Sequence, residues 1–308
     1  MIKRIVEISA RPLWITVRND QLRLDEPPQD GGENVASIPC EDVGVLLVEH
    51  PQAMLSHSAL TRLMEYGAAV VFCGRDHLPV GLALPVSRNV EVVARLNTQL
   101  QAARPVRKRL WTQLVVAKIR AQAQNLHHAP NVRSRLLAMA RRVKSNDPQN
   151  LEAHAARTYW HAWLGSHHAA NAFRRRPDAP GINGLLNYGY AVVRAAVGRA
   201  IVAAGLTPAL GVHHHQRSNA FALADDLLEP LRPLVDRSVQ RLVSESSEEL
   251  TPDTKKVLLH LLLDPVAFDG ETGPLIVVLH RYTAAFVRCL ERTQRKLPVP
   301  VALDQDAP

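Results

Sequence analysis

The spacing of apolar residues divides the chain near residue 90. Before that point, apolar and polar residues alternate or form short apolar runs, a pattern typical of strands. Two of these segments flank Asn19-Asp20, which predicts a hairpin. Strands are expected at residues 2–8, 13–17, 21–24, 43–48, 68–73 and 79–84, and a helix at 56–66. We therefore predict a small β-rich domain over residues 1–90.

Beyond residue 90, apolar residues recur every three or four positions, which predicts helices. Helical segments are expected at residues 92–125, with a break at Pro105, and at 131–143, 148–165, 183–204, 221–245, 251–263 and 273–297. The proline-bearing end, residues 298–308, is predicted to be a disordered tail. The predicted fold class is α+β, with a β-rich first domain and a larger all-α domain over residues 91–297. A chain of 308 residues fits two domains better than one or three.

Positive charge is concentrated in the predicted helical domain. The net charge is +8, yet residues 92–146 hold twelve Lys and Arg and no acid, and residues 153–224 hold seven Arg against the single acid Asp178. Such segments repel themselves unless a long anion lies across them, which predicts binding to a nucleic acid backbone. Ribosomal and membrane-surface proteins share this composition. The candidate phosphate-binding residues are Arg107, Lys108, Arg109, Arg133, Arg141, Arg142, Arg174, Arg175 and Arg176.

The remaining composition bears on location and on the role of the first domain. Residues 1–90 are mildly acidic, so we expect a dimerisation or partner-docking surface there. The chain has no long uncharged apolar run and no basic-then-apolar leader at Met1, so we predict neither a membrane span nor a signal peptide. Its three cysteines form no CxxC pair, which favours a reducing cytoplasm over a disulfide framework or a cysteine zinc site.

Three consecutive histidines, His213 to His215, precede the segment FALADDLLEPLRP by about one loop's length. Helical spacing in that segment places Asp225 and Asp226 each about one turn from Glu229. A carboxylate on the helix and an imidazole on the preceding loop would converge on one cation. Carboxylate oxygens with a single imidazole suit Mg²⁺ or Mn²⁺ better than zinc. A solvated histidine loop beside carboxylates that face water is the alternative that spacing leaves open.

A second candidate carboxylate is Glu152. Asn146-Asp147-Pro148 predicts a helix start, with a capping residue followed by a proline in the first turn. Glu152 is the only acid between Asp147 and Asp178, and a lone carboxylate among cations suggests a metal or a partner. It can also complement the positive end of the helix dipole. The later helix over 183–204 is predicted to be a packed core helix, and a cleft role for its Asn187 or Tyr190 stays open.

The order of these motifs along the chain is similar to that in a known family. A Glu on a helix after DPxN, then INGLLNYGYA, LGVHHH and DLLEPLRPLVD, resembles the CRISPR-associated spacer-acquisition integrase, the metal-dependent enzyme that inserts new spacers into CRISPR arrays. Residues 41–82 resemble the corresponding region of the branch found in type II systems. The resemblance implies an N-terminal β-sandwich-like domain and a helical catalytic domain. The implied ligands of Mg²⁺ or Mn²⁺ are Glu152, His214 and Glu229, with Asp226, His213 and Asn187 as possible supporting residues. Because His213 and His215 flank His214, the histidine assignment is good to within one residue.

The resemblance also implies a reaction and partners. The 3′-hydroxyl of a spacer precursor attacks a phosphodiester at the edge of a repeat, and double-stranded DNA is bound by its phosphates. Homodimers are bridged by a small ferredoxin-like CRISPR adaptation partner protein. Two alternatives remain: a transposon-type integrase or nuclease outside CRISPR with the same site, and a non-catalytic DNA-binding scaffold.

Overall fold

The structure, a computed structural model, describes residues 3–75, 79–85, 89–165 and 173–303. Its N-terminal strands form two sheets. One has the order β1 (Arg4–Ile8), β5 (Val43–Val48), β7 (Ala69–Cys73) and β8 (Pro79–Ala83), and the other has the order β4 (Asn34–Pro39), β3 (Gln21–Asp25), β2 (Trp14–Arg18) and β6 (Met54–Leu55). Between the strands lie the short 3-10 helices η1 (Pro28–Asp30) and η2 (Cys40–Asp42) and helix α1 (His57–Glu65). In the β2–β3 hairpin, Asn19 and Asp20 have φ of 51° and 59°, as a tight hairpin turn requires.

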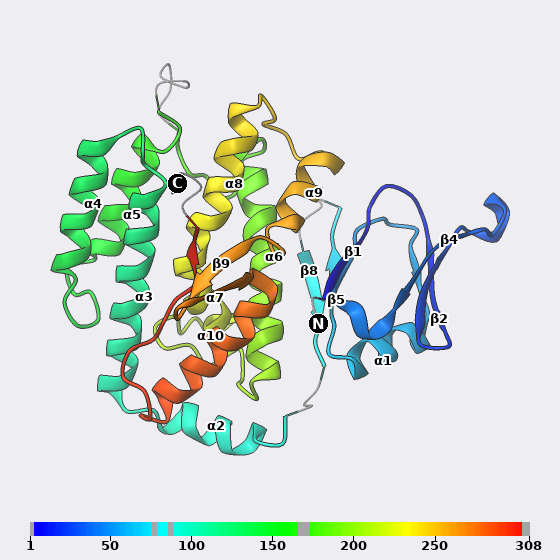
Figure 1. Cartoon of the computed structure of the whole chain (residues 1–308), viewed down its shortest axis with the longest axis horizontal. Coiled ribbons are helices and arrows are strands. Elements are labelled where there is room, and N and C mark those ends of the chain that lie inside the picture. The colour runs from blue at the N-terminus through cyan, green and yellow to red at the C-terminus, as the bar shows by residue number, and fades with distance from the viewer. Residues whose placement is uncertain (1–2, 76–78, 86–88, 166–172, 304–308) are drawn as a thin grey trace.

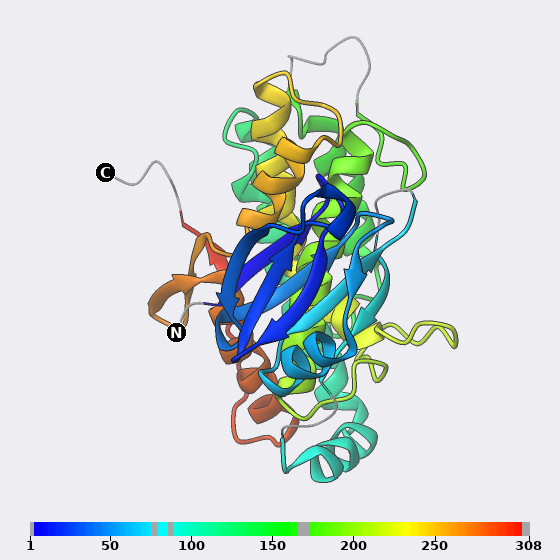
Figure 2. The same ribbon diagram turned by 90° about the vertical axis from the view of Figure 1, so that its right-hand side faces the viewer.

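The N-terminal sheets pack face to face, and strand β5 shows how they meet the rest of the chain. Its sequence VGVLLV is a continuous apolar run because both of its faces are buried. Leu46 belongs to the core between the sheets, whereas Val45 and Leu47 belong to the core of the helical part. Figure 2 shows the β-rich part lying against the helices, where β7 and β8 contact α6 (Ile182–Ala203). The predicted β-sandwich-like domain is confirmed.

The larger part of the chain is helical and surrounds α6 (Figure 1). Its other helices are α2 (Val92–Gln101), α3 (Arg104–Gln124), α4 (Pro130–Arg142), α5 (Leu151–Ala162), α7 (Ala222–Leu228), η4 (Glu229–Leu231), α8 (Arg232–Ser244), α9 (Pro252–His260) and α10 (Leu275–Leu290). Pro105 lies in the first turn of α3, where its missing N–H does no harm, so the predicted break is confirmed. A Cβ on Gly189 of α6 would lie 2.4 Å from Cγ1 of Val235, so this glycine lets α6 and α8 approach closely.

The prediction of an all-α second domain was wrong in one detail. Strands β9 (Pro265–Phe268) and β10 (Glu271–Pro274) form a hairpin, and β11 (Val301–Ala302) pairs with β9. The Asp269-Gly270 turn has φ of 51° and 84°, and Asp-Gly is a strong hairpin signal that the helical pattern on either side obscured. The predicted disordered tail is corrected as well, because β11 lies within it. Residues 304–308 of that tail are outside the described residues.

The predicted helix over 221–245 is divided into three elements. Pro230 and Pro233 interrupt it, so α7 gives way to η4 and then to α8. This break places Glu229 at the start of a short 3-10 helix instead of inside a long helix. In the part of the chain that the structure describes, no helix is long and apolar enough to cross a membrane. The three cysteines, all of them described, form no disulfide bond.

Candidate active site

Helix α5 holds Glu152 in its first turn. The side chain of Asp147 accepts the backbone N–H of Leu151 at 2.9 Å and that of Glu152 at 2.8 Å. These bonds satisfy two of the donors that every helix leaves unpaired at its start. The capping by Asp147 was predicted, but α5 begins three residues later than expected. Residues 147–150 form a turn in which Asn150 has a φ of 51°, and this turn delays the helix.

Glu229 comes from a different element and meets Glu152 at a shared cation. Arg232 donates from Nε to Oε1 of Glu229 at 3.0 Å. The ammonium of Lys118, on α3, contacts Oε2 of Glu229 and Oε1 of Glu152. Burial alone would raise the pKa of Glu229, but the charges of Lys118 and Arg232 lower it to about 2. Burial likewise opposes the charge on Lys118, yet the two carboxylates raise its pKa above the ordinary value.

His214 is oriented by Asp226, a fully buried carboxylate on α7. One oxygen of Asp226 accepts the N–H groups of Val212 at 2.6 Å and His213 at 3.0 Å, and the other accepts the N–H of His214 at 3.2 Å. The His214 ring adds a bond from Nδ1 to Asp226 at 2.6 Å, and this bond raises the pKa of His214. Because Asp226 already accepts three N–H groups, Nδ1 is the protonated nitrogen. The Nε2 lone pair is then available, and no described residue hydrogen-bonds to it.

The neighbours of His214 differ in environment. The ring of His213 stacks on Trp111 of α3 with centroids 3.9 Å apart, and burial lowers its pKa. His215 is exposed. A Cβ on Gly211 would lie 2.5 Å from the carbonyl oxygen of His214 and 2.8 Å from the Asp226 carboxylate, so the loop needs a glycine there. This geometry distinguishes His214 from the two flanking histidines, because only the ring of His214 is hydrogen-bonded to Asp226.

The donor set fits the predicted ion chemically. No group of three or more His, Cys, Asp or Glu side chains among the described residues is arranged as a ready metal site. The ammonium of Lys118 lies where the carboxylates of Glu152 and Glu229 converge. The ammonium acts as a stand-in that shows that this pair can share a cation. Two carboxylates with an imidazole match the preference of Mg²⁺ or Mn²⁺, and the three residues stay predicted ligands.

Comparison with known proteins identifies the family. A family model described as CRISPR associated protein Cas1 matches residues 8–260. The chain belongs to the Cas1 family. The CRISPR-associated endonuclease Cas1 of Neisseria meningitidis serogroup C is 33% identical over 280 residues, which cover 89% of this chain and 90% of the relative. A second relative, a Cas1 endonuclease of Pyrobaculum aerophilum, is 28% identical and covers 85% of this chain and 92% of its own length.

Solved structures share the fold at lower identity. A casposase bound to its integration product superimposes with a TM-score of 0.77 and 18% identity, covering 96% of this chain and 92% of the casposase. A Cas1 protein from Thermotoga maritima gives a TM-score of 0.73 and 17% identity, covering 98% and 100% of the two chains. The resemblance seen in the sequence motifs is confirmed at the level of family and fold.

Two residues of α6 for which a cleft role was left open, Asn187 and Tyr190, have different surroundings. Asn187 accepts a hydrogen bond from Arg175 at 2.5 Å and donates one to the carbonyl of Pro177 at 2.6 Å, so it anchors the segment before α6. No described contact joins Asn187 to a candidate ligand. Tyr190 donates its hydroxyl to the buried Asp236, and its ring lies under the guanidinium of Arg232. Tyr190 therefore supports the arginine that holds Glu229.

The predicted phosphate-binding residues fall into two groups. The exposed ones, which have no described carboxylate within ion-pair distance, are Arg133, Arg141, Arg142, Arg174 and Arg176. Arg107 donates to the carbonyls of Gln99 and Leu100, so it holds the end of α2. Arg175 is bound to Asn183 and Asn187. The half-buried Lys108 and Arg109 lie beside Arg107 on α3. The exposed group is the better surface for phosphate contact.

The site residue that the sequence analysis missed is Lys118. It was counted among the basic residues of segment 92–146, which holds no acid, and a lysine in such a segment is ordinarily expected at the surface. The signal was its spacing, because Lys118 falls in the same helical stripe as Leu114, Val115 and Ile119, all of which are fully buried. A lysine inside an apolar stripe requires a buried carboxylate partner.

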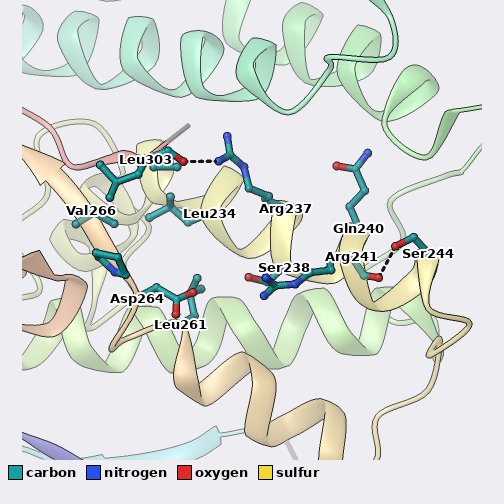
Figure 3. Close-up of a pocket in the computed structure, with 12 residues that line it drawn as sticks. Leu234, Arg237, Ser238, Gln240, Arg241, Ser244, Leu261, Asp264, Val266 and Leu303 are labelled. Atoms are coloured by element: carbon teal, nitrogen blue, oxygen red, sulfur yellow. Dashed lines mark hydrogen bonds between the residues drawn. The ribbon is translucent and has the colours of Figure 1, made fainter. Parts of the chain in front are cut away.

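A cavity of about 640 Å³ lies away from these residues, along α8 and the end of the chain (Figure 3). Leu234, Leu261 and Val266 supply apolar lining, and Arg237 reaches across to donate to the carbonyl of Leu303 at 3.1 Å. None of the candidate ligands lines it. In this Cas1 family member the two candidate carboxylates instead contact Lys118.

Proposed function

We propose that this protein is a metal-dependent DNA endonuclease and integrase that inserts new spacer DNA into a CRISPR array. The observation that carries the proposal is the convergence of Glu152 and Glu229 on one buried cation, together with an imidazole that Asp226 orients and whose pKa the charge of Glu229 also raises. Membership of the Cas1 family, with an endonuclease as the 33% identical relative, supports a nuclease or integrase chemistry at that site. In the proposed reaction, a spacer 3′-hydroxyl attacks a phosphodiester at a repeat edge.

The ion supplies the charge that phosphoryl transfer needs, because Mg²⁺ or Mn²⁺ neutralises the attacked phosphate and orients the oxygen nucleophile. Glu152, His214 and Glu229 would hold it. The rest of the site fixes these side chains before reaction. Asp226 sets the tautomer of His214, and Arg232 holds one oxygen of Glu229.

The proposed partners are DNA, a second copy of the chain and a small ferredoxin-like protein. The exposed arginines of α4 and of the segment before α6 would contact phosphates without reading bases. Two structural neighbours support this assignment: the casposase was solved with its integration product, and a Cas6-RT-Cas1 protein was solved in complex with Cas2. The β-rich domain is the expected homodimer surface.

A strand-transfer assay tests the function directly. A labelled short duplex with free 3′-hydroxyls is incubated with a plasmid that bears a CRISPR repeat, with Mn²⁺ or Mg²⁺, with and without the small partner. Wild type is compared with Glu229→Gln and Glu152→Gln, which keep the side-chain size, and with Asp225→Asn. Asp225 is the matched control because it pairs with Arg194 and contacts no candidate ligand.

We expect metal-dependent joining at the repeat that the two Gln variants abolish while DNA affinity is retained. Joining at random positions would favour a transposon-type integrase over spacer insertion. If the protein binds DNA but neither joins nor cuts it with any metal, the enzyme hypothesis is wrong and the protein is a DNA-binding scaffold. Equal loss in Asp225→Asn would show that the Gln variants report on folding and not on chemistry.

A further inference from the structure

Lys118 is placed where a lysine is costly. Its side chain is 9% exposed and projects from α3 between fully buried neighbours such as Leu114 and Val115. A buried ammonium destabilises a protein unless carboxylates compensate it. Its only described ion pairs are with Glu152 and Glu229, which are the two carboxylates proposed to bind the ion. The free-energy cost of burying this charge is therefore offset by the same two carboxylates that are proposed to bind the ion.

The contacts of Lys118 leave little of the carboxylate pair unoccupied. Oε1 of Glu152 and Oε2 of Glu229 contact the ammonium, and Oε1 of Glu229 accepts from Arg232. Of the four carboxylate oxygens, only Oε2 of Glu152 has no described partner. An ion that binds both carboxylates must use an oxygen of Glu229, and Lys118 or Arg232 already contacts each of these two oxygens. Because the ammonium of Lys118 contacts both carboxylates, it competes with the ion for the pair.

We propose that Lys118 is a positioning residue that holds Glu152 and Glu229 together and gates their loading with a divalent cation. This inference rests on the proposed function, because it assigns a regulatory role within the same site. The four-carbon stem of lysine lets its ammonium swing from carboxylate to phosphate without a change in the backbone. When a DNA phosphate arrives, the ammonium transfers its contacts to that phosphate and the carboxylates become available. Ion binding is therefore weak on the free protein and becomes tight when DNA is present.

The gate has a measurable signature in the absence of catalysis. Mn²⁺ binding to the full-length protein is measured by calorimetry for wild type, Lys118→Met and Lys118→Gln. Removing the competing charge should tighten Mn²⁺ binding by about tenfold or more, because two like charges otherwise share one small site. Mn²⁺ should also raise the melting temperature of both variants more than that of wild type. Lys256→Met, which removes an exposed positive charge on α9, is the matched control and should bind Mn²⁺ as wild type does.

The second arm measures coupling between DNA and the ion. A short duplex with 3′-deoxy ends cannot be joined, so binding is seen without reaction. In wild type this duplex should tighten Mn²⁺ binding by about tenfold, and in Lys118→Gln most of that gain should be absent, because coupling through Lys118 is reciprocal. If Lys118→Met folds only with Mn²⁺, this is the expected result of removing the cation that compensates Glu152 and Glu229. The Mn²⁺ affinities are then measured on Lys118→Gln.

Two results would overturn the gate. If Lys118→Gln binds Mn²⁺ no more tightly than wild type, Lys118 does not compete with the ion. If DNA tightens Mn²⁺ binding equally in both proteins, the ammonium does not transfer its contacts to phosphate. Either result is compatible with metal-dependent joining that Glu229→Gln abolishes, so the proposed function would survive it. Loss of the function itself would appear instead as no metal-dependent joining by wild type.

Discussion

Replacing Asp226 by Asn is the most informative change to the site, because it alters charge and hydrogen bonding with almost no change in shape. Asp226 is fully buried and accepts four hydrogen bonds, two on each oxygen. An Asn side chain has one acceptor oxygen and one NH₂ group. Its oxygen is best placed toward the N–H groups of Val212 and His213, which turns the NH₂ group toward His214.

The cost of that arrangement can be worked out bond by bond. Two bonds change from charged to neutral acceptors, at about 1 kcal/mol each, and the N–H of His214 faces another donor, at about 1–3 kcal/mol. The sum of about 3–5 kcal/mol is a large share of the 5–15 kcal/mol that stabilises a typical domain. The His214 ring meets the NH₂ group only if Nδ1 accepts, which moves its proton to Nε2. A protonated Nε2 cannot bind a metal.

Urea unfolding followed by circular dichroism measures the stability change, and single-turnover strand transfer measures the effect on chemistry. We expect Asp226→Asn to be folded at 25 °C, to be less stable by the amount above, and to join DNA about 10–100-fold more slowly, as is typical for residues that orient a metal ligand. The ¹⁵N NMR chemical shifts of the His214 ring show which of its two nitrogens carries the proton. Asp225→Asn is the control, because its partly exposed ion pair with Arg194 contributes about 1 kcal/mol or less.

A variant as stable as wild type to within about 0.5 kcal/mol and fully active would refute this account of Asp226, since changes that small are usual for surface substitutions. A destabilised variant with full activity would keep the loop-anchoring role and refute the tautomer argument.

Three further predictions follow from the same structure. Gly211→Ala should abolish joining and lower the melting temperature, because its Cβ would lie 2.5 Å from the carbonyl oxygen of His214. Burial raises the pKa of Asp236 to about 7, so between pH 4 and 7 the folded chain holds a proton that the unfolded chain has released. Stability should therefore fall as pH rises through that window, and urea unfolding of Asp236→Asn should show a flatter pH dependence. Changing Arg133, Arg141 and Arg142 to Gln should weaken DNA binding for all sequences and reduce the slope of log K against log salt by up to about 0.9 per lost contact, measured by fluorescence anisotropy.

Local sequence patterns were sufficient to find the segments of the site. The capping residue before Glu152, the glycine-led loop of His214 and the helical spacing of Asp226 and Glu229 all depend on neighbours within a few positions. The proline break at Pro230 is also local, although its effect on Glu229 was not foreseen. Helix boundaries shifted by a few residues where a turn, as at Asn150, competed with the helix start.

The convergence of Glu152 with Glu229 was implied only by the family resemblance, and local patterns could not predict it, because it depends on packing between elements far apart in the chain. Glu152 and Glu229 meet through a third residue, Lys118, which comes from a helix that was interpreted only as a basic surface. The spacing of Leu114, Val115, Lys118 and Ile119 marks one face of α3 as buried, but a single sequence does not show that α5 and η4 are the elements that cover it. The β9–β10 hairpin was missed for a related reason, since its short strands lie between strong helical patterns.

The strand β11 has a consequence for the timing of folding during synthesis. The segment before it crosses α3, where Gln113 donates to the carbonyl of Arg295 and accepts the N–H of Leu297, and the chain then pairs with β9. Proteins fold from the N-terminus as they leave the ribosome, so the β-sandwich is complete long before this segment emerges. The helix that carries Lys118 packs mainly on α4, α5 and η4, and it gains these last contacts only when residues 295–302 have been made. We expect a nascent chain to have folded N-terminal sheets before residues 295–302 emerge, and to gain the contacts of α3 with β11's segment only after they do.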